Sequence, residues 1–346
     1  MIPGEELARR DAVDAALEAF VQERRRDLEP LGPDATALLD LARDAVAGGK
    51  RLRPTFCRAG WLAAGGDPDD GRIDVAAAGL EWLQASALVH DDVMDDSDVR
   101  RGRPSVHRAV ESTHREGGWS GDAAAHGRAV AIVLGDLLLS WADQQLRASA
   151  LPTVGRGLDL LDLCRSEVAT GQYLDVLAQT RPEVGVEEAL RIVRFKAATY
   201  TVERPMQIGA ALAGADDAFV DALSSVALPL GEAFQLRDDV LGVFGDPEVT
   251  GKPAGDDLRE GKRTVLVART VERAGPQERE QLRRLLGTRE GIAPLRDMIV
   301  RSGALAAVEK DIADREQAAR DALDLLPQAA RAAIEPLLLV GTRRSR

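Results

Sequence analysis

The chain has 346 residues, with 57 acidic and 45 basic side chains and a formal net charge of −12. This excess of acid argues against a general nucleic-acid surface. Two cysteines, Cys57 and Cys164, are too few for a disulfide framework or a four-cysteine zinc site. The opening residues lack the apolar core of a signal peptide, and the longest apolar run, 129–134, is far shorter than the ~20 residues of a membrane span. We therefore expect a soluble, cytoplasmic protein without a transmembrane segment.

Helical periodicity runs through most of the chain. Apolar residues recur at helical spacing in segments such as 80–88, 130–141 and 158–168, and alternating strand patterns are hard to find. Short stretches with glycine and proline separate these segments, which favours antiparallel neighbours. No linker rich in proline or serine divides the sequence. We predict one all-α domain over residues 1–346, with a basic C-terminal tail at about 342–346.

The first candidate site in chain order is the segment GGKRLRP, residues 48–54. Its glycines let the backbone approach an anion, and its three cations can bind phosphate by charge and hydrogen bonding. On its own, such a segment is more typical of a solvated surface.

The strongest feature is the acidic run HDDVMDDSD, residues 90–98, at the end of an apolar helical stretch that begins near Ile73. At 100° per residue, Asp91 and Asp95 lie about 40° apart on one helix face, and Asp92 lies about 100° from Asp91. Two carboxylates one turn apart repel each other unless a cation lies between them. Mg²⁺ suits such oxygen ligands, because it takes one or two carboxylates together with waters and substrate phosphates. The run therefore indicates an Mg²⁺ site, and a solvated acidic helix end is the alternative.

A second acidic cluster lies in FQLRDD, residues 234–239. Gln235 falls angularly between Asp238 and Asp239, so the three side chains can face one cavity. A third acid one turn further on would stand at position 242, which is Gly242. Pairs of aspartates are common on exposed helix faces, so this motif alone is a weak indication of function.

Basic residues follow each acidic cluster along the chain. RRGRP (100–104) comes directly after the first cluster, and Lys252 and Lys262 follow the second within TGKP (250–253) and EGKRT (260–264). None of the glycine-containing segments fits the phosphate loop GxxxxGK[ST] or the dinucleotide turn GxGxxG. The combination favours a polyanionic phosphate, held by metal on one side and by guanidinium or ammonium groups on the other.

Together these motifs resemble the trans-isoprenyl diphosphate synthases, the polyprenyl synthetase family, and geranylgeranyl diphosphate synthases in particular. GGKRLRP, DDVMDDSDVRRGRP, GQYLD (171–175), QLRDD and the later GK and EGKRT occur in the order and rough spacing of that family, over residues 48–265. The resemblance implies the all-α isoprenoid-synthase fold, a helical bundle around a central cavity. It also implies a homodimer.

By this resemblance, carboxylates on two sides of the cavity would hold the metal. Asp91 and Asp95 would coordinate Mg²⁺ on the allylic diphosphate, with Asp92 in support. Asp238, beside Asp239, would hold a further Mg²⁺ from across the cavity. Three Mg²⁺ ions per site are implied.

The resemblance also assigns the substrate contacts. Those for the allylic diphosphate are Arg100, Lys196, Lys252 and Lys262, with Gln235 nearby. Those for isopentenyl diphosphate are Lys50, Arg53, Gln84 and Arg101. Gln172 and Asp175 share a helix face and would lie behind the ligands or on the substrate side.

The implied reaction is the head-to-tail addition of isopentenyl diphosphate to dimethylallyl, geranyl or farnesyl diphosphate. Diphosphate is a poor leaving group until its charge is neutralised, and Mg²⁺ with Lys and Arg stabilises that charge as it develops. The double bond of isopentenyl diphosphate attacks the allyl cation, and a proton is then lost. No activated nucleophile is needed, so His90 and the two cysteines are interpreted as structural.

Product length depends on the side chains that precede the first acidic cluster on the same helix. Along the axis, Ala87 lies about 6 Å from Asp91, Leu83 about 12 Å and Leu80 about 16 Å. Ser86 and Ala87 stand where farnesyl-type members of the family often carry aromatic residues. Their small side chains argue against farnesyl diphosphate as the limit and predict geranylgeranyl diphosphate, with Leu80, Leu83 and Trp82 closing the tunnel deeper down.

Several alternatives stay open. A farnesyl or longer polyprenyl diphosphate synthase would keep the chemistry and move the tunnel floor. A class I terpene cyclase shares the bundle and the Asp-rich motif, but it needs no GGKRLRP site and tends to line its pocket with aromatics, which make up only 3% here. A non-catalytic subunit of a heteromeric synthase would lose its metal or cation sites.

Two positions depart from the family pattern. Gly242 replaces the last acid of the second motif, and Ala197 replaces a threonine that often follows the motif lysine. Because Asp238 and Asp239 remain, we expect reduced redundancy among the acids rather than loss of activity.

Overall fold

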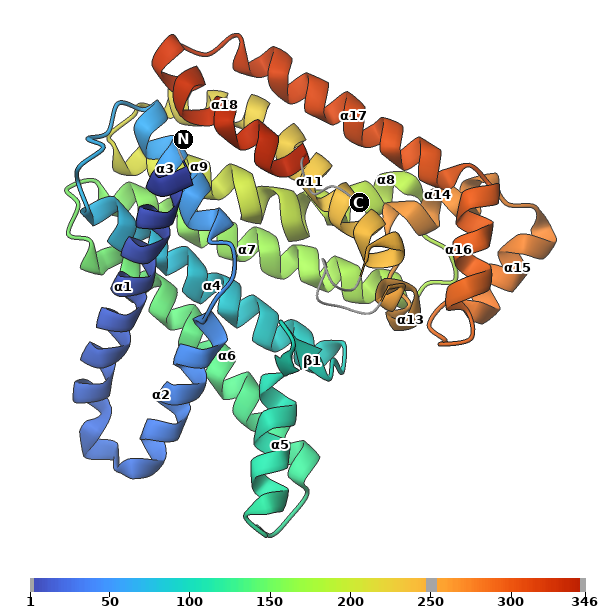
Figure 1. Ribbon diagram of the computed structural model, residues 1–346, viewed down its shortest axis with the longest axis horizontal. Coiled ribbons are helices and arrows are strands. Elements are labelled where there is room, and N and C mark those ends of the chain that lie inside the picture. The colour runs from blue at the N-terminus through green and yellow to red at the C-terminus, as the bar shows by residue number, and fades with distance from the viewer. Residues whose placement is uncertain (1–2, 247–253, 343–346) are drawn as a thin grey trace.

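The computed structural model describes residues 3–246 and 254–342, and helices dominate this part of the chain (Figure 1). The predicted all-α class is therefore confirmed. The first elements are α1 (Pro3–Leu28), the 3₁₀ turn η1 (Glu29–Leu31), α2 (Pro33–Val46), α3 (Leu52–Ala63) and α4 (Arg72–Met94). The next are β1 (Val99–Arg100), β2 (Arg103–Pro104), α5 (Val106–Glu116), α6 (Ala123–Ala148), α7 (Val154–Gln179), α8 (Val186–Ile192) and the π-helical η2 (Val193–Glu203).

The remaining helices belong to the C-terminal half of the chain. They are α9 (Arg204–Leu212), α10 (Asp217–Ala222), α11 (Ser224–Phe244), α13 (Asp256–Glu260), α14 (Val265–Arg273), α15 (Pro276–Leu285), α16 (Ile292–Arg301), α17 (Ala304–Leu323) and α18 (Gln328–Thr342). In Figure 1, α17 runs along one side of the molecule, and the α1–α2 pair projects away from it.

Buried apolar side chains form three clusters, each shared by helices that are distant in sequence. The first joins α1–α4, α6, α7 and α9, and in it the rings of Phe20, Trp82 and Trp141 pack with centroids 5.2–5.8 Å apart. The second joins α8, α11 and α14–α17. The third joins α3, α9, α11 and α18. Because α11 contributes to two clusters, it connects the C-terminal helices with α3 and α9.

The helix α4 carries the first acidic cluster and is buried along most of its length. It packs against α1, α3, α6 and α9, which explains why its sequence is apolar on nearly every face until His90. Its last turn closes with a hydrogen bond from the Asp95 amide to the Asp91 carbonyl, 2.8 Å long. The acidic run therefore begins where α4 leaves the core.

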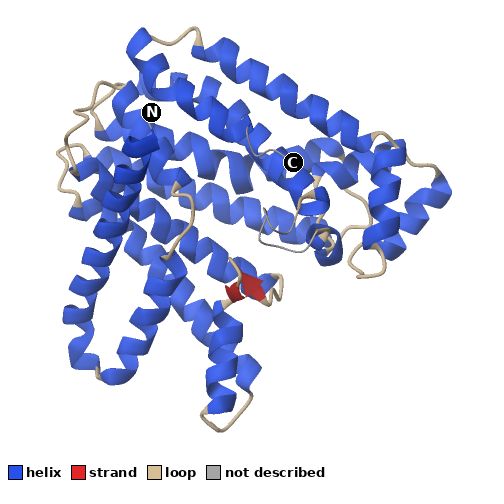
Figure 2. Cartoon of the chain, in the orientation of Figure 1, coloured by secondary structure: helices blue, strands red, loops and turns tan. Residues whose placement is uncertain are grey.

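A two-stranded hairpin follows directly and is the only sheet among the described residues (Figure 2). Val99 pairs with Pro104, and Arg100 pairs with Arg103. Its two turn residues, Arg101 and Gly102, have φ of +53° and +73°, as a type I′ turn requires. This tight turn holds Arg100 and Arg101 next to the end of α4.

One described helix, α6, is long and apolar enough to cross a membrane by length and composition alone. A single helix of this kind is weak evidence, since core helices of soluble proteins pass the same test. It packs on α4 and α5 and buries Leu134, Leu138 and Trp141, whereas Ile132 and Val133 are exposed. The absence of a transmembrane segment stays a prediction.

The π-helical segment η2 crosses α7 at Gly171. A Cβ atom at position 171 would lie 2.5 Å from the backbone nitrogen of Lys196, so only glycine permits this approach. The contact places Lys196 beside Gln172 and Asp175 of α7. π-Helical turns are rare and are found frequently at functional sites.

Candidate active site

The sequence motifs meet at one open cavity of about 710 Å³. Its walls come from α4, α7, η2 and α11, together with segments 49–53, 100–101 and 256–264. Most of the predicted site residues line it: Lys50, Arg53, Gln84, Ala87, Asp91, Arg100, Arg101, Gln172, Asp175, Lys196, Gln235, Asp238, Asp239 and Lys262.

The other predicted residues have different places. Asp92 is buried next to the wall and Asp95 is partly buried there, and both pair with cations that line the cavity. Ser86, Leu83 and Leu80 are buried within α4 and are not among the residues that line the cavity. Lys252 and residues 343–346 of the predicted basic tail lie outside the described residues.

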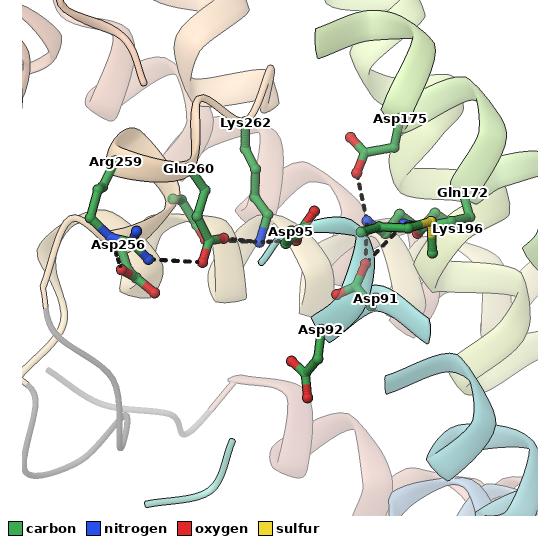
Figure 3. Close-up of polar contacts among 12 residues, drawn as sticks. Asp91, Asp92, Asp95, Gln172, Asp175, Lys196, Asp256, Arg259, Glu260 and Lys262 are labelled. Carbon is green, nitrogen blue, oxygen red and sulfur yellow. Dashed lines mark hydrogen bonds and ion pairs between the residues drawn. The ribbon is translucent and has the colours of Figure 1, made fainter. Parts of the chain in front are cut away.

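Asp91 is surrounded by positive charge (Figure 3). Gln172 Nε2 donates a hydrogen bond to Asp91 Oδ1 over 2.9 Å, and Lys196 Nζ lies 3.6 Å from the same oxygen. Lys196 also donates to Asp175 Oδ2 over 2.6 Å. Burial opposes ionisation of Asp91, but three nearby cations outweigh it and hold the pKa of this carboxyl below its ordinary value. Asp91 is therefore present as a carboxylate.

Asp95 lies one turn after Asp91, and nearby cations balance its negative charge less completely than that of Asp91. Its side chain is 7% exposed, and its Oδ2 accepts no hydrogen bond from any described residue, although Lys262 Nζ lies 3.5 Å away. Burial and the charge of Asp91 raise the pKa of Asp95 to about 6. The ammonium group of Lys262 also contacts two other carboxylates, Glu260 Oε2 at 2.6 Å and Asp257 Oδ1 at 3.6 Å. The buried oxygen of Asp95 marks a place where a further cation fits.

Arg100 is turned from the hairpin onto Asp92. Its Nε and Nη2 donate to Asp92 Oδ1 over 2.9 and 2.5 Å, and Nη2 lies 3.9 Å from Asp91 Oδ2. Since Asp92 is buried and Arg100 lines the cavity, Asp92 orients the guanidinium from behind.

The basic segment before α3 faces another part of the cavity. Arg51 has φ of +52°, and its buried guanidinium pairs with Glu81 at 2.6 Å and Asp14 at 2.5 Å. This anchor fixes the segment, in which Lys50, Arg51 and Arg53 all line the cavity. The sequence alone suggested that all three cations of this segment could bind phosphate. Because two carboxylates hold its guanidinium, we interpret Arg51 as a residue that supports the segment.

Arg53 and Gln84 are joined by a residue that the sequence analysis missed, Tyr200. The Arg53 guanidinium lies 4.0 Å from the centre of the Tyr200 ring and donates to Thr201 Oγ1 over 2.8 Å. The Tyr200 hydroxyl donates to Gln84 Oε1. Tyr200 follows Lys196 by four residues, and that spacing was the only available signal.

On the opposite wall, α11 directs its two motif acids to the cavity and its motif arginine away from it. Gln235 Nε2 donates to Asp239 Oδ1 over 2.8 Å. Burial and the charge of nearby Asp257 hold the pKa of Asp239 well above its ordinary value. Arg237 makes two hydrogen bonds to Glu309 of α17, over 2.6 and 2.7 Å. The motif therefore combines a wall of the cavity with an anchor for the helix.

The donors of this site fit Mg²⁺ shared with a phosphate ligand. Within the described residues, no three acidic, histidine or cysteine side chains come together as a complete metal site. Mg²⁺ is usually bound by one or two carboxylates plus substrate phosphates and water, so it needs no such cage. Asp91 and Asp95 supply hard oxygens from one wall, Asp238 lies in the other, and the unsatisfied Asp95 Oδ2 accommodates a cation.

Other chemistry-bearing residues lie away from this arrangement. His90 Nε2 contacts the Ile132 carbonyl at 3.2 Å and Asp136 at 3.6 Å on α6. Cys57 and Cys164 are buried and unpaired, and burial raises the pKa of the Cys164 thiol to about 12. These thiols are therefore unreactive at neutral pH.

A model of the polyprenyl synthetase family matches residues 35–299 of this chain. Among curated proteins, the chain is 34% identical over 286 residues to a geranylfarnesyl diphosphate synthase of Aeropyrum pernix, covering 81% of this chain and 85% of that protein. It is 36% identical over 227 residues to a (2E,6E)-farnesyl diphosphate synthase of Mycobacterium tuberculosis, covering 66% and 58%.

Among solved structures, the fold is similar to that of a geranylgeranyl pyrophosphate synthase from Corynebacterium glutamicum, complexed with isoprenyl diphosphate and magnesium. The TM-score is 0.92 at 40% identity, covering 97% of this chain and 98% of that chain. The three names differ in product length and agree in the class of diphosphate product.

Proposed function

Because this chain belongs to the polyprenyl synthetase family, we propose that it is a geranylgeranyl diphosphate synthase. Family membership rests on the match over residues 35–299, and it makes the protein a prenyltransferase of the Mg²⁺-dependent kind that elongates prenyl diphosphates. Its substrates are accordingly prenyl diphosphates. The length of the product is the finer part of the proposal.

The observation that carries the product length is the small side chain of Ala87. Ala87 and Leu88 line the cavity next to Asp91 on α4, together with Val168 of α7. If the diphosphate is held at Asp91, its hydrocarbon tail passes Ala87 within about one helical turn, and a methyl group leaves room for it. Leu83 and Leu80 lie further along α4 in the first apolar cluster, with exposed fractions of 2% and 1%. We assign the floor of the tunnel to this pair.

The charged residues divide into two proposed groups around the reacting atoms. Lys196, Lys262 and Arg100 bind the allylic diphosphate and exchange their present carboxylate partners for phosphate oxygens as it enters. Asp91, Asp95 and Asp238 would hold Mg²⁺, which would neutralise charge on the departing diphosphate. We propose three ions per site.

For the second substrate, Lys50, Arg53 and Arg101 bind the diphosphate of isopentenyl diphosphate. Tyr200 holds Arg53 and Gln84 in register, so that the double bond meets the allylic carbon in a fixed orientation. The lost proton passes to the departing diphosphate, which needs no side-chain base. The residues of this chain therefore contribute by neutralising the charge of the diphosphates and by orienting the two substrates.

The decisive experiment is product analysis. The purified protein is incubated with Mg²⁺, isopentenyl diphosphate and each allylic primer in turn, and the dephosphorylated products are separated by chromatography. A twenty-carbon alcohol is the expected main product. A fifteen-carbon product would contradict the assignment of the floor, and elongation from none of the primers would favour a non-catalytic subunit.

Two variants locate the floor. Ala87→Phe places a ring in the cavity wall, and we expect it to shift the main product to fifteen carbons or fewer. Ser86→Phe also shortens the product but by a smaller proportion, because Ser86 is buried outside the lining. Ala87→Ser is the matched control and keeps the length of the wild-type product.

We further propose a homodimer joined through α6 and α7. Only 28% of the apolar stretch of α6 is buried in the monomer. The exposed apolar side chains on these two neighbouring helices are Ile132, Val133, Leu163, Tyr173 and Val176. A second copy of the chain would cover them. Light scattering should give twice the chain mass, and Val133→Glu should give a monomer; a monomeric wild-type protein would contradict the proposal.

Two organisational predictions stand with these proposals. We propose that residues 1–346 form one domain, since α3, α9 and α11 each contribute to two buried clusters. Limited proteolysis should then release no stable fragment. The cytoplasmic location also stays a prediction.

A further inference from the structure

The second acidic cluster lacks its third carboxylate in sequence, yet a carboxylate stands in that space. Position 242 lies about one helical turn after Asp238 and Asp239 on α11 and is a glycine. A Cβ atom at Gly242 would lie 2.1 Å from Asp257 Oδ2 and 2.8 Å from Asp257 Cγ. The carboxylate of Asp257 therefore occupies the volume that a side chain at position 242 would fill.

The main chain holds Asp257 in this place. The amide of Gly255 donates to the carbonyl of Gly242 over 2.9 Å, which fastens the start of α13 to α11. Gly255 has φ of +86°, a conformation that favours glycine, and Asp257 follows in the first turn of α13. The amide of Lys262 in turn donates to the Asp257 carbonyl over 3.0 Å. The position of the carboxylate is thus fixed by backbone contacts from both sides.

Asp257 faces the same charges as the first cluster. Its side chain is 17% exposed and lines the cavity together with Asp238 and Asp239. Lys262 Nζ lies 3.6 Å from Asp257 Oδ1 and 3.5 Å from Asp95 Oδ2, so one ammonium group lies between the two walls. Asp95 Oδ2, buried and without a hydrogen bond among the described residues, is the independent sign that this space takes a cation.

We propose that Asp257 is the third carboxylate of the α11 wall and takes the place in Mg²⁺–diphosphate binding that the residue at position 242 cannot take. The inference rests on the proposed arrangement in which Asp238 holds Mg²⁺. The carboxylate of Asp257 binds the metal, or the waters bound to it, from α13. Lys262 binds the phosphate oxygens.

Exchange of the two positions tests the proposal. Asp257→Ala and Asp257→Asn should each weaken Mg²⁺ binding about ten-fold or more, the size of effect seen when groups that support a metal are removed. Gly242→Asp alone puts a second carboxylate within contact of Asp257 and should lower thermal stability. The double variant Gly242→Asp with Asp257→Ala should recover Mg²⁺ affinity to within about three-fold of wild type.

Binding is read by calorimetric titration of Mg²⁺ in the presence of inorganic diphosphate, alongside the Mg²⁺ concentration that gives half-maximal elongation. Asp297→Ala, an exposed acid on α16, is the control and should match wild type in both. Circular dichroism confirms that each variant is folded, and Asp257→Asn retains the shape of the side chain if Asp257→Ala does not fold.

Unchanged Mg²⁺ affinity in the folded Asp257 variants would overturn the proposal. A double variant that binds Mg²⁺ no better than Asp257→Ala would overturn the exchange of positions. Failure of the product assignment would look different, because it changes the chain length made by the wild type and leaves the calorimetric comparison intact.

Discussion

The two acidic walls of the cavity are built differently. On the α4 wall, Asp91, Asp92 and Asp95 all come from the end of one helix. On the α11 wall, Asp238 and Asp239 come from a helix, and the third carboxylate in their company, Asp257, comes from the separate segment α13. When all the acids come from one helix, their positions depend on the register of that helix. When they come from two segments, as on the α11 wall, the cluster tolerates the absence of one acid from its helix.

The compensation of charge differs in the same way. The acids of the α4 wall contact cations or amides from α7, η2 and the hairpin, so that Asp91 is ionised before any ligand binds. Asp239 on the α11 wall contacts the amide of Gln235 and lies near a further carboxylate, and its pKa is held high by burial. Asp91 is thus prepared as an anion, whereas Asp95 on the same wall and Asp239 on the α11 wall gain most from an added cation.

The largest effect is expected from removing single charges on the two walls. Asp91→Asn should lower kcat/KM on the order of 10³-fold, about 4 kcal/mol, because Asp91 is the one described carboxylate that accepts a hydrogen bond from Gln172 and no neighbour on α4 replaces it. Asp238→Asn should cost about ten-fold less, since Asp239 and Asp257 lie in the same wall. Steady-state kinetics at saturating Mg²⁺ measures both.

The order of the two losses is the informative result. If Asp238→Asn lowers kcat/KM as much as Asp91→Asn, the α11 wall has no redundancy, and the contrast between the walls is wrong. Asp297→Ala serves again as the exposed acidic control, with kinetics equal to those of wild type.

The sequence made the α4 wall predictable because helical periodicity alone brings Asp91 and Asp95 together. The all-α class was predictable for the same reason. Asp257 could not be placed in this way, since its approach to Gly242 depends on a tertiary contact between α11 and α13. Tyr200 was missed because it lies in η2, where the α-helical period does not hold.

The roles assigned by resemblance are a separate matter. The cavity brings Lys50, Lys196 and Lys262 to its lining, as the motifs implied, but their contacts with substrate stay predictions. The spacing of the motifs does not reveal the partner of Arg100. This cation was expected to bind diphosphate, and in the structure it is held by the buried Asp92. The partner of a charged side chain depends on packing from several elements, and no single motif contains that information.

A smaller effect is expected at the anchor of the α11 wall. Arg237→Met removes both hydrogen bonds to Glu309. The pair is partly exposed, with fractions of 22% and 41%, so we expect a loss of about 1 kcal/mol or less in the free energy of unfolding. Activity should stay within about three-fold of wild type, because the guanidinium points away from the cavity.

Urea denaturation of Arg237→Met, Glu309→Gln and the double variant gives the coupling between the two side chains. Coupling near zero would show that α17 does not anchor the motif through this pair. A fall in activity without loss of stability would place Arg237 at the substrate and contradict its assignment as an anchor.

The smallest expected effect concerns the support of the α4 wall and depends on pH. His107 of α5 is 2% exposed, contacts Ser105 Oγ through Nδ1 at 3.2 Å, and lies 3.9 Å from Asp96 through Nε2. Burial, and then the charge of Arg108, hold the pKa of His107 below its ordinary value, although Asp92, Asp96 and Glu111 act in the opposite direction.

The native state therefore keeps His107 neutral, while the unfolded chain takes up its proton near the ordinary histidine pKa of about 6.5. Below that pH the unfolded state binds more protons, so the free energy of unfolding falls as the pH is lowered through this range. Urea denaturation at pH of about 7.5 and about 5.5 should show a larger loss in wild type than in His107→Asn, which has no proton to take up. If wild type and His107→Asn lose the same free energy of unfolding, Asp96 compensates the charge of the protonated ring. The hairpin side of the α4 wall would then tolerate added positive charge as well as the α11 wall does.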